Sequence, residues 1–155
     1  MMVGCCNSPK VKLYCEHSAL TKAIKKLNRN GKVMLMHFPY DLCSHSPKKR
    51  RIAIPSTGAQ HQDLRLPISD LPGRIADYSG SSKLAAILRI IGDKNRQDAL
   101  HIDTAFKNGC AAFITCDSEN ILIYRVDLEQ LLGIRFFHPY QHSDLEQFVD
   151  SVVCS

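Results

Sequence analysis

The chain has 155 residues, of which 45% are hydrophobic and 23% charged, with a formal net charge of +5 and a pI near 8.9. This length suits one domain with a sizeable core, so we expect a single domain over residues 1–155. No apolar run approaches the roughly 20 residues of a membrane helix, so we expect a soluble protein without a membrane span. The basic charge favours polyanionic partners, which a positive surface attracts before any specific contact forms.

Seven cysteines are scattered along the chain without the paired spacing of a structural zinc site. Reduced thiols in a cytosolic protein explain this pattern best. The first residues lack the basic start and the full apolar stretch of a signal peptide, and the last residues lack a prenylation signal. We therefore expect a cytoplasmic protein that is neither exported nor anchored.

The chain begins with a predicted strand, a helix and a second strand. Residues 11–15, VKLYC, are rich in β-branched and aromatic side chains, and Glu16 follows them directly. Apolar residues recur at helical spacing over residues 18–27. Residues 33–38, VMLMHF, are nearly continuously apolar, which is typical of a strand covered on both faces, and Asp41 lies just beyond them.

Residues 39–80 contain five prolines and only short apolar pieces. We expect this stretch to be a long proline-rich insertion or flap. It includes one basic run, formed by Lys48, Lys49, Arg50 and Arg51. The run either follows an RNA backbone as an electrostatic arm or forms an ordinary solvated face.

The rest of the chain alternates between helices and strands. Helical periodicity and strand composition predict elements over residues 81–92, 96–107, 111–115, 121–132, 134–137 and 143–153, of which 111–115 and 134–137 are strands. With the two earlier strands, this makes four strands joined by helices. Such alternation implies right-handed crossovers. We therefore predict an α/β fold in which helices cover both faces of a small, mostly parallel sheet.

Acidic residues follow three of the four predicted strands. They are Glu16 after the first, Asp41 after the second and Asp117 after the third. In open parallel sheets, ligands bind outside the carboxyl ends of the strands. In the predicted helix that precedes Asp117, Asp98 lies about 40° from the centre of the apolar face, whereas Asp103 lies about 100° away. We therefore expect Asp98 to point inward, toward the strand end that carries Asp117.

Each of these acids also has an ordinary structural interpretation. Asp98 can close a capping box with Asn95, Asp117 can be a turn or cap residue, and Glu16 can be a solvated loop acid. Several carboxylates at one edge repel each other, however, and divalent cations reconcile them best. Carboxylates without histidine or cysteine partners select Mg²⁺ or Mn²⁺, which activate water and neutralise a phosphodiester under attack.

Two segments resemble motifs of the PIN-domain nuclease family. Residues 98–117, DALHIDTAFKNGCAAFITCD, resemble the third and fourth motifs: an acid opening a helix, a T-A step, a glycine, and a strand closing in T-x-D. Residues 13–20, LYCEHSAL, are similar to the first motif, in which a strand ends in an acid before a small polar pair. The resemblance implies a three-layer α/β/α sandwich whose acids bind Mg²⁺ or Mn²⁺ and hydrolyse RNA. Members of the family are often toxins held by an antitoxin protein, and often homodimers.

The resemblance also assigns roles by position. It makes Asp98 and Asp117 catalytic acids that hold the metal, and it makes Thr115 a residue that orients the site through its hydroxyl. Glu16 stands where the family usually has aspartate, and its longer side chain either reaches the metal or marks a weakened site. The basic run of the proline-rich stretch is the expected contact to RNA.

The family's second acid normally lies on a helix after the second strand, and this chain has no clear equivalent. We assign Asp41 to this metal position, with Asp70 and Asp77 as alternatives. The primary hypothesis is therefore a metal-dependent endoribonuclease, acting as the toxin of a toxin–antitoxin pair. The alternative is a catalytically weakened PIN-like module that binds RNA or a protein partner. A third hypothesis is a small-molecule-binding α/β protein unrelated to nucleases.

Overall fold

The structure is a computed structural model, and it describes residues 10–36 and 80–155. Its centre is a four-stranded sheet with the strand order β2-β1-β3-β4. The strands are β1 (Val11–Cys15), β2 (Val33–Met36), β3 (Ala112–Ile114) and β4 (Arg135–Phe137). All neighbouring strands run parallel, so their carboxyl ends meet at one edge of the sheet. The predicted α/β fold with a small parallel sheet is confirmed.

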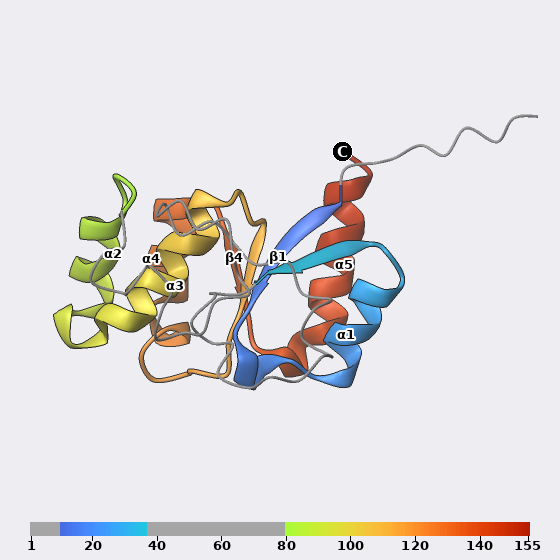
Figure 1. Cartoon of the computed structure of the whole chain (residues 1–155), viewed down its shortest axis with the longest axis horizontal. Helices are drawn as coiled ribbons and strands as arrows, with labels where there is room; N and C mark the ends of the chain where they lie inside the picture. The colour runs from blue at the N-terminus through green and yellow to red at the C-terminus, as the bar shows by residue number, and fades with distance from the viewer. Residues whose placement is uncertain (1–9, 37–79) are drawn as a thin grey trace, which may run out of the picture.

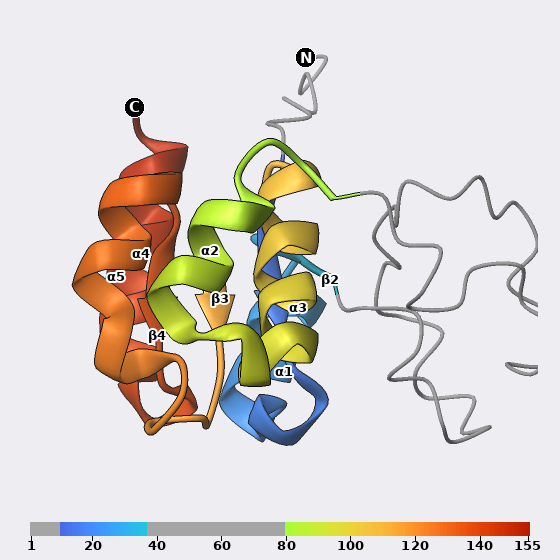
Figure 2. The same cartoon turned by 90° about the vertical axis from the view of Figure 1, so that its left-hand side faces the viewer.

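Helices cover both faces of this sheet (Figure 1). One face carries α1 (Lys22–Arg29) and α5 (His142–Val153). The other carries α2 (Leu84–Ile91), α3 (Arg96–Lys107) and α4 (Arg125–Leu132), and in Figure 2 these helices lie toward the viewer. The arrangement is a three-layer α/β/α sandwich, as expected. No helix among the described residues is both long enough and apolar enough to cross a membrane.

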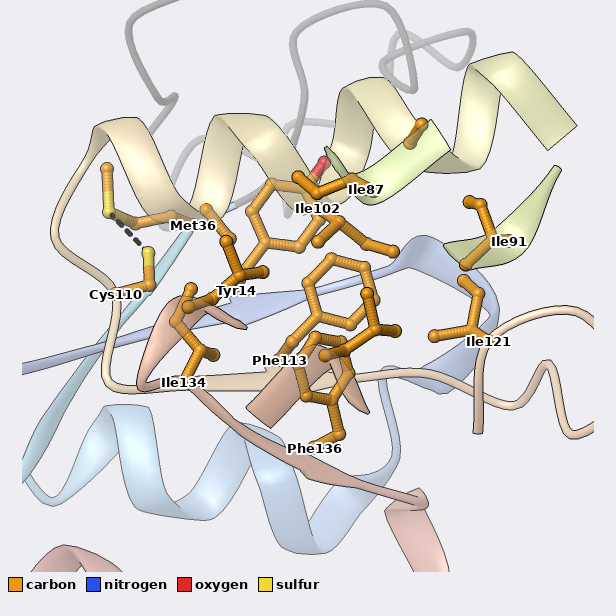
Figure 3. Packing of buried hydrophobic residues seen from close by; sticks show 14 residues of the cluster. Tyr14, Met36, Ile87, Ile91, Ile102, Cys110, Phe113, Ile121, Ile134 and Phe136 are labelled. Carbon is orange, nitrogen blue, oxygen red and sulfur yellow. Dashed lines mark hydrogen bonds between the residues drawn. The ribbon is translucent and has the colours of Figure 1, made fainter. Parts of the chain in front are cut away.

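The alternating side chains of the strands form two separate cores. Leu13 and Ile114 are fully buried beneath α1 and α5. Tyr14 and Phe113 are fully buried on the opposite side, beneath α2, α3 and α4 (Figure 3). Their two rings are stacked with centroids 4.9 Å apart. Because both faces of each strand are buried, the strands read as nearly continuous apolar sequence.

The helices match the predicted ranges except at some of their starts. α3 spans the predicted residues 96–107, whereas α1 begins at Lys22 and not at residue 18. Thr21 caps α1 by accepting a hydrogen bond from the backbone N–H of Ile24 at 3.4 Å. The residues before this cap form a short 3₁₀ turn, η1 (His17–Ala19), and a similar turn, η7 (Leu122–Tyr124), precedes α4. α4 ends at Gly133, whose φ of 68° favours glycine.

Three segments form what we call the carboxyl edge of the sheet. They are residues 16–19 after β1, residues 115–120 after β3 and residues 138–141 after β4. The last segment contains the short 3₁₀ helix η8 (Pro139–Gln141). The C-terminus, at the end of α5, lies on the opposite side of the molecule (Figure 1).

Candidate functional site

Glu16 and Thr115 are joined directly at the carboxyl edge. The backbone N–H of Glu16 donates to the carbonyl of Ile114 at 3.1 Å, so the first residue after β1 remains paired with β3. Thr115 is fully buried, and its N–H donates to the carbonyl of Phe137 at 3.0 Å. The hydroxyl of Thr115 donates to Oε2 of Glu16 at 2.7 Å. A buried hydroxyl from a neighbouring strand end therefore orients the half-buried carboxylate of Glu16.

The same hydroxyl also organises Asp117. It accepts a hydrogen bond from the backbone N–H of Asp117 at 3.0 Å. The carboxylate of Asp117 accepts from the backbone N–H of Asn120 at 2.9 Å and from the side-chain amide of Asn120 at 3.2 and 3.3 Å. Asp117 therefore has the turn-capping role that was its structural interpretation. Because a carboxylate offers about four acceptor positions, these bonds leave capacity for a further ligand.

Asp98 lies near Asp117 without forming the capping box. Asn95 occupies the N-cap position of α3, but its side-chain amide donates to the carbonyl of Ile91, the last residue of α2, at 2.7 Å and does not cap α3. Asp98 is half-buried, and its carboxylate makes no hydrogen bond or ion pair with another described residue. Burial, and secondly the nearby carboxylate of Asp117, raise the pKa of Asp98 above its ordinary value. Two like charges thus approach each other, which is the condition that favours a cation between them.

The donors at this edge suit a hard cation in their chemistry. Glu16, Asp98 and Asp117 all offer carboxylate oxygens, the ligands that Mg²⁺ and Mn²⁺ prefer. Two thiols lie nearby, and both are turned to backbone carbonyls: Cys15 donates to the carbonyl of Glu16 at 3.4 Å and Cys116 to that of Ser18 at 3.5 Å. Burial, and secondly the charge of Glu16, raise the pKa of both thiols. Within residues 10–36 and 80–155, however, no three acids, histidines or cysteines already lie together as a ligand group. Glu16 and Asp117 are joined through the hydroxyl of Thr115. Asp98 and Asp117 interact as like charges.

Several predicted site residues lie outside the described part of the chain. These are Asp41, its alternatives Asp70 and Asp77, and the basic residues Lys48, Lys49, Arg50 and Arg51. The fourth acid and the basic RNA contact therefore stay predictions.

The burial of Asp103 differs from what its angle on the predicted helix indicates. This residue is fully buried, whereas Asp98, which is nearer to the centre of the apolar face, is only half-buried. The backbone N–H of Ser81 donates to Oδ2 of Asp103 at 2.9 Å, and the hydroxyl of Ser81 donates to Oδ1. The segment that leads into α2 therefore covers this flank of α3. The angle around one helix says nothing of a covering segment that lies 22 residues away in the sequence.

The segment after β4 also belongs to the edge, although no role was predicted for it from the sequence. Its most prominent residue is Tyr140 in η8, whose exposed fraction is 83%. The sequence signal for a role in ligand binding was a tyrosine three residues beyond the end of a predicted strand, because ligands bind at the carboxyl end of parallel sheets.

The fold and the site together define a class, a parallel α/β/α sandwich with carboxylates gathered at the carboxyl edge of its sheet. Comparisons with protein-family models, with curated proteins and with solved structures find no match to this chain.

Proposed function

We propose that this protein is a Mg²⁺- or Mn²⁺-dependent endoribonuclease of PIN type, with Glu16, Asp98 and Asp117 as its acidic centre. The approach of Asp98 to Asp117 carries the proposal. The half-buried carboxylate of Asp98 has a raised pKa and no described hydrogen-bond partner or cation. Because such an arrangement lowers the stability of the ionised protein, it is more typical of a functional site than of a structural one.

Each residue of the edge would have a defined task. Asp98 and Asp117 would hold the cation, and Glu16 would complete the set from β1. The 2.7 Å bond from Thr115 would keep the Glu16 carboxylate turned to the site. When bound, the ion supplies charge neutralisation at the phosphodiester and lowers the pKa of the attacking water.

Cleavage of a fluorescently labelled single-stranded RNA tests this proposal. We expect the wild type to cleave the RNA in the presence of Mn²⁺, and we expect cleavage to stop when EDTA is added. Asp98→Asn and Asp117→Asn should each reduce cleavage to the background rate, because amides replace the anionic ligands without changing side-chain shape. Thermal unfolding would verify that both variants remain folded.

Asp150→Asn is the matched control for these substitutions. Asp150 is exposed near the C-terminal end of α5, where its carboxylate pairs with Lys32 at 3.5 Å. An exposed pair contributes little to stability, so this variant should cleave RNA like the wild type. Full cleavage by both Asp98→Asn and Asp117→Asn would refute the nuclease assignment.

A second candidate is a catalytically weakened module that binds RNA without cutting it. The observation that favours it is the lack of a ready three-residue ligand group among the described acids, histidines and cysteines. In a gel-mobility assay, such a module would shift the RNA equally in Mn²⁺ and in EDTA, and the RNA would stay intact in both. The nuclease would shift intact RNA only in EDTA, because it would cleave the RNA in Mn²⁺.

A further inference from the structure

Tyr140 lies in the segment after β4, at the same carboxyl edge of the sheet as the acidic centre. β4 ends at Phe137, whose carbonyl accepts the N–H of Thr115 at 3.0 Å, so the ends of β3 and β4 are level. Tyr140 follows three residues later and is the most exposed large hydrophobic residue in the described part of the chain, at 83%. Isolated exposed apolar residues are common, but this one lies at the edge where the carboxylates gather.

The turn that carries Tyr140 is rigid. His138 caps η8: its backbone N–H donates to Oε1 of Gln141 at 3.0 Å, and its Nδ1 accepts the backbone N–H of Tyr140 at 3.2 Å. The N–H of Gln141 closes the turn on the carbonyl of His138 at 2.8 Å. Pro139, which is buried, restricts the backbone further. A ligand that uses Tyr140 would therefore lose little entropy in ordering the backbone of the turn.

The rings of this segment form a small aromatic surface in a polar setting. The imidazole of His138 and the ring of Tyr140 have centroids 4.9 Å apart and planes inclined by 31°. The neighbouring Gln141 is half-buried, and His142 is exposed. The ring of Tyr140 therefore stands among polar groups. This setting suits a planar, hydrogen-bonding ligand better than a broad apolar partner surface.

We propose that Tyr140, backed by His138, is a stacking platform for a nucleobase of the RNA substrate. The inference rests on the proposed function, because RNA is the ligand whose phosphodiester would lie at Asp98 and Asp117. Single-stranded RNA is commonly bound by stacking its unpaired bases on aromatic side chains. Every base has a π-face, so the platform should tolerate any sequence. Tyr140 would be a positioning residue, which holds a base while the backbone reaches the acids.

Binding of RNA in EDTA, where no cleavage occurs, tests the platform. The probe is a labelled single-stranded RNA of about 12 nucleotides, read by fluorescence anisotropy. We expect Tyr140→Ala to raise Kd about fivefold or more, the usual loss for one stacked base. Tyr140→Phe should keep the wild-type affinity, because it retains the ring. Inorganic polyphosphate, which carries charge but no bases, should bind the wild type and Tyr140→Ala equally.

Val153→Ala is the control, since Val153 is half-exposed at the opposite end of α5. Val153→Ala should leave RNA affinity unchanged. Tyr140→Ala should unfold at the same temperature as the wild type, which shows that it remains folded. Equal RNA affinity of the wild type and Tyr140→Ala would overturn the platform and leave the nuclease proposal standing. Equal losses for RNA and polyphosphate would also overturn it, because stacking would not be the cause. Absence of RNA binding by the wild type would overturn both proposals.

Discussion

His101 gives the fold a pH dependence that can be measured at the scale of one residue. Its Nδ1 lies 2.5 Å from the hydroxyl of Tyr14, and burial lowers its pKa from 6.5 to about 4. The folded protein keeps the imidazole neutral, whereas the unfolded chain binds a proton below pH 6.5. Stability is therefore complete above that pH and falls as the pH drops toward 4, by about 3 kcal/mol in total.

Urea unfolding of the wild type and His101→Gln between pH 7 and pH 4.5 measures this effect. The free energy of unfolding should fall less with pH in His101→Gln, because the variant has no titrating ring at this position. The exposed His142 supplies the control, and His142→Gln should keep the wild-type dependence. An equal pH dependence in all three proteins would contradict the assignment.

Individual site residues could be predicted to different extents. Glu16 was predicted from the end of its strand, because parallel register brings the strand ends together, whereas Thr115 was predicted only from the resemblance to the T-x-D motif. Asp98 was expected from its helix angle to point toward the strand end that carries Asp117, and the charge of Asp117 does act on it in the structure. The burial of Asp103 could not be predicted, since Ser81 covers it from another element.

At the scale of the elements, the contact between Ser81 and Asp103 fastens the segment before α2 to α3. The Asp103 carboxylate is fully buried and accepts both the N–H and the hydroxyl of Ser81. Ser81→Ala removes the hydroxyl donor from this buried carboxylate. We expect a loss of about 1.5–3 kcal/mol in the free energy of unfolding, measured in urea.

The adjacent Ser82 is exposed, so Ser82→Ala should change the free energy of unfolding by less than about 0.5 kcal/mol. Equal stability of Ser81→Ala and Ser82→Ala would show that the contact between Ser81 and Asp103 does not hold the segment before α2.

The strands and the long helices could be predicted because their patterns are local. β-Branched and aromatic composition marked β1, a nearly continuous apolar run marked β2, and 3.6-residue periodicity marked α3 over its full length. The 3₁₀ turns η1 and η7 were read as the first turns of helices, because a short turn and a helix start have similar composition. Their true bounds depend on single hydrogen bonds, such as the cap from Thr21 to Ile24.

At the scale of the whole molecule, the parallel sandwich brings residues far apart in the sequence to one edge. Glu16 after β1, Asp117 after β3 and Tyr140 after β4 all lie at this edge, because the carboxyl ends of their strands are neighbours. Asp98 joins them from α3, which begins near the same edge and packs over it. Both proposals concern this edge, the acids as a cation site and Tyr140 as the adjoining contact for a base.

Isothermal titration of Mn²⁺ into the wild type and into Asp98→Asn tests the cation site most directly. If the carboxylates of Asp98 and Asp117 share a cation, the wild type should give a saturable binding heat. Asp98→Asn should then bind Mn²⁺ at least about tenfold more weakly, because an amide replaces one anionic ligand. No binding heat from the wild type at millimolar Mn²⁺ would contradict a metal centre at this edge.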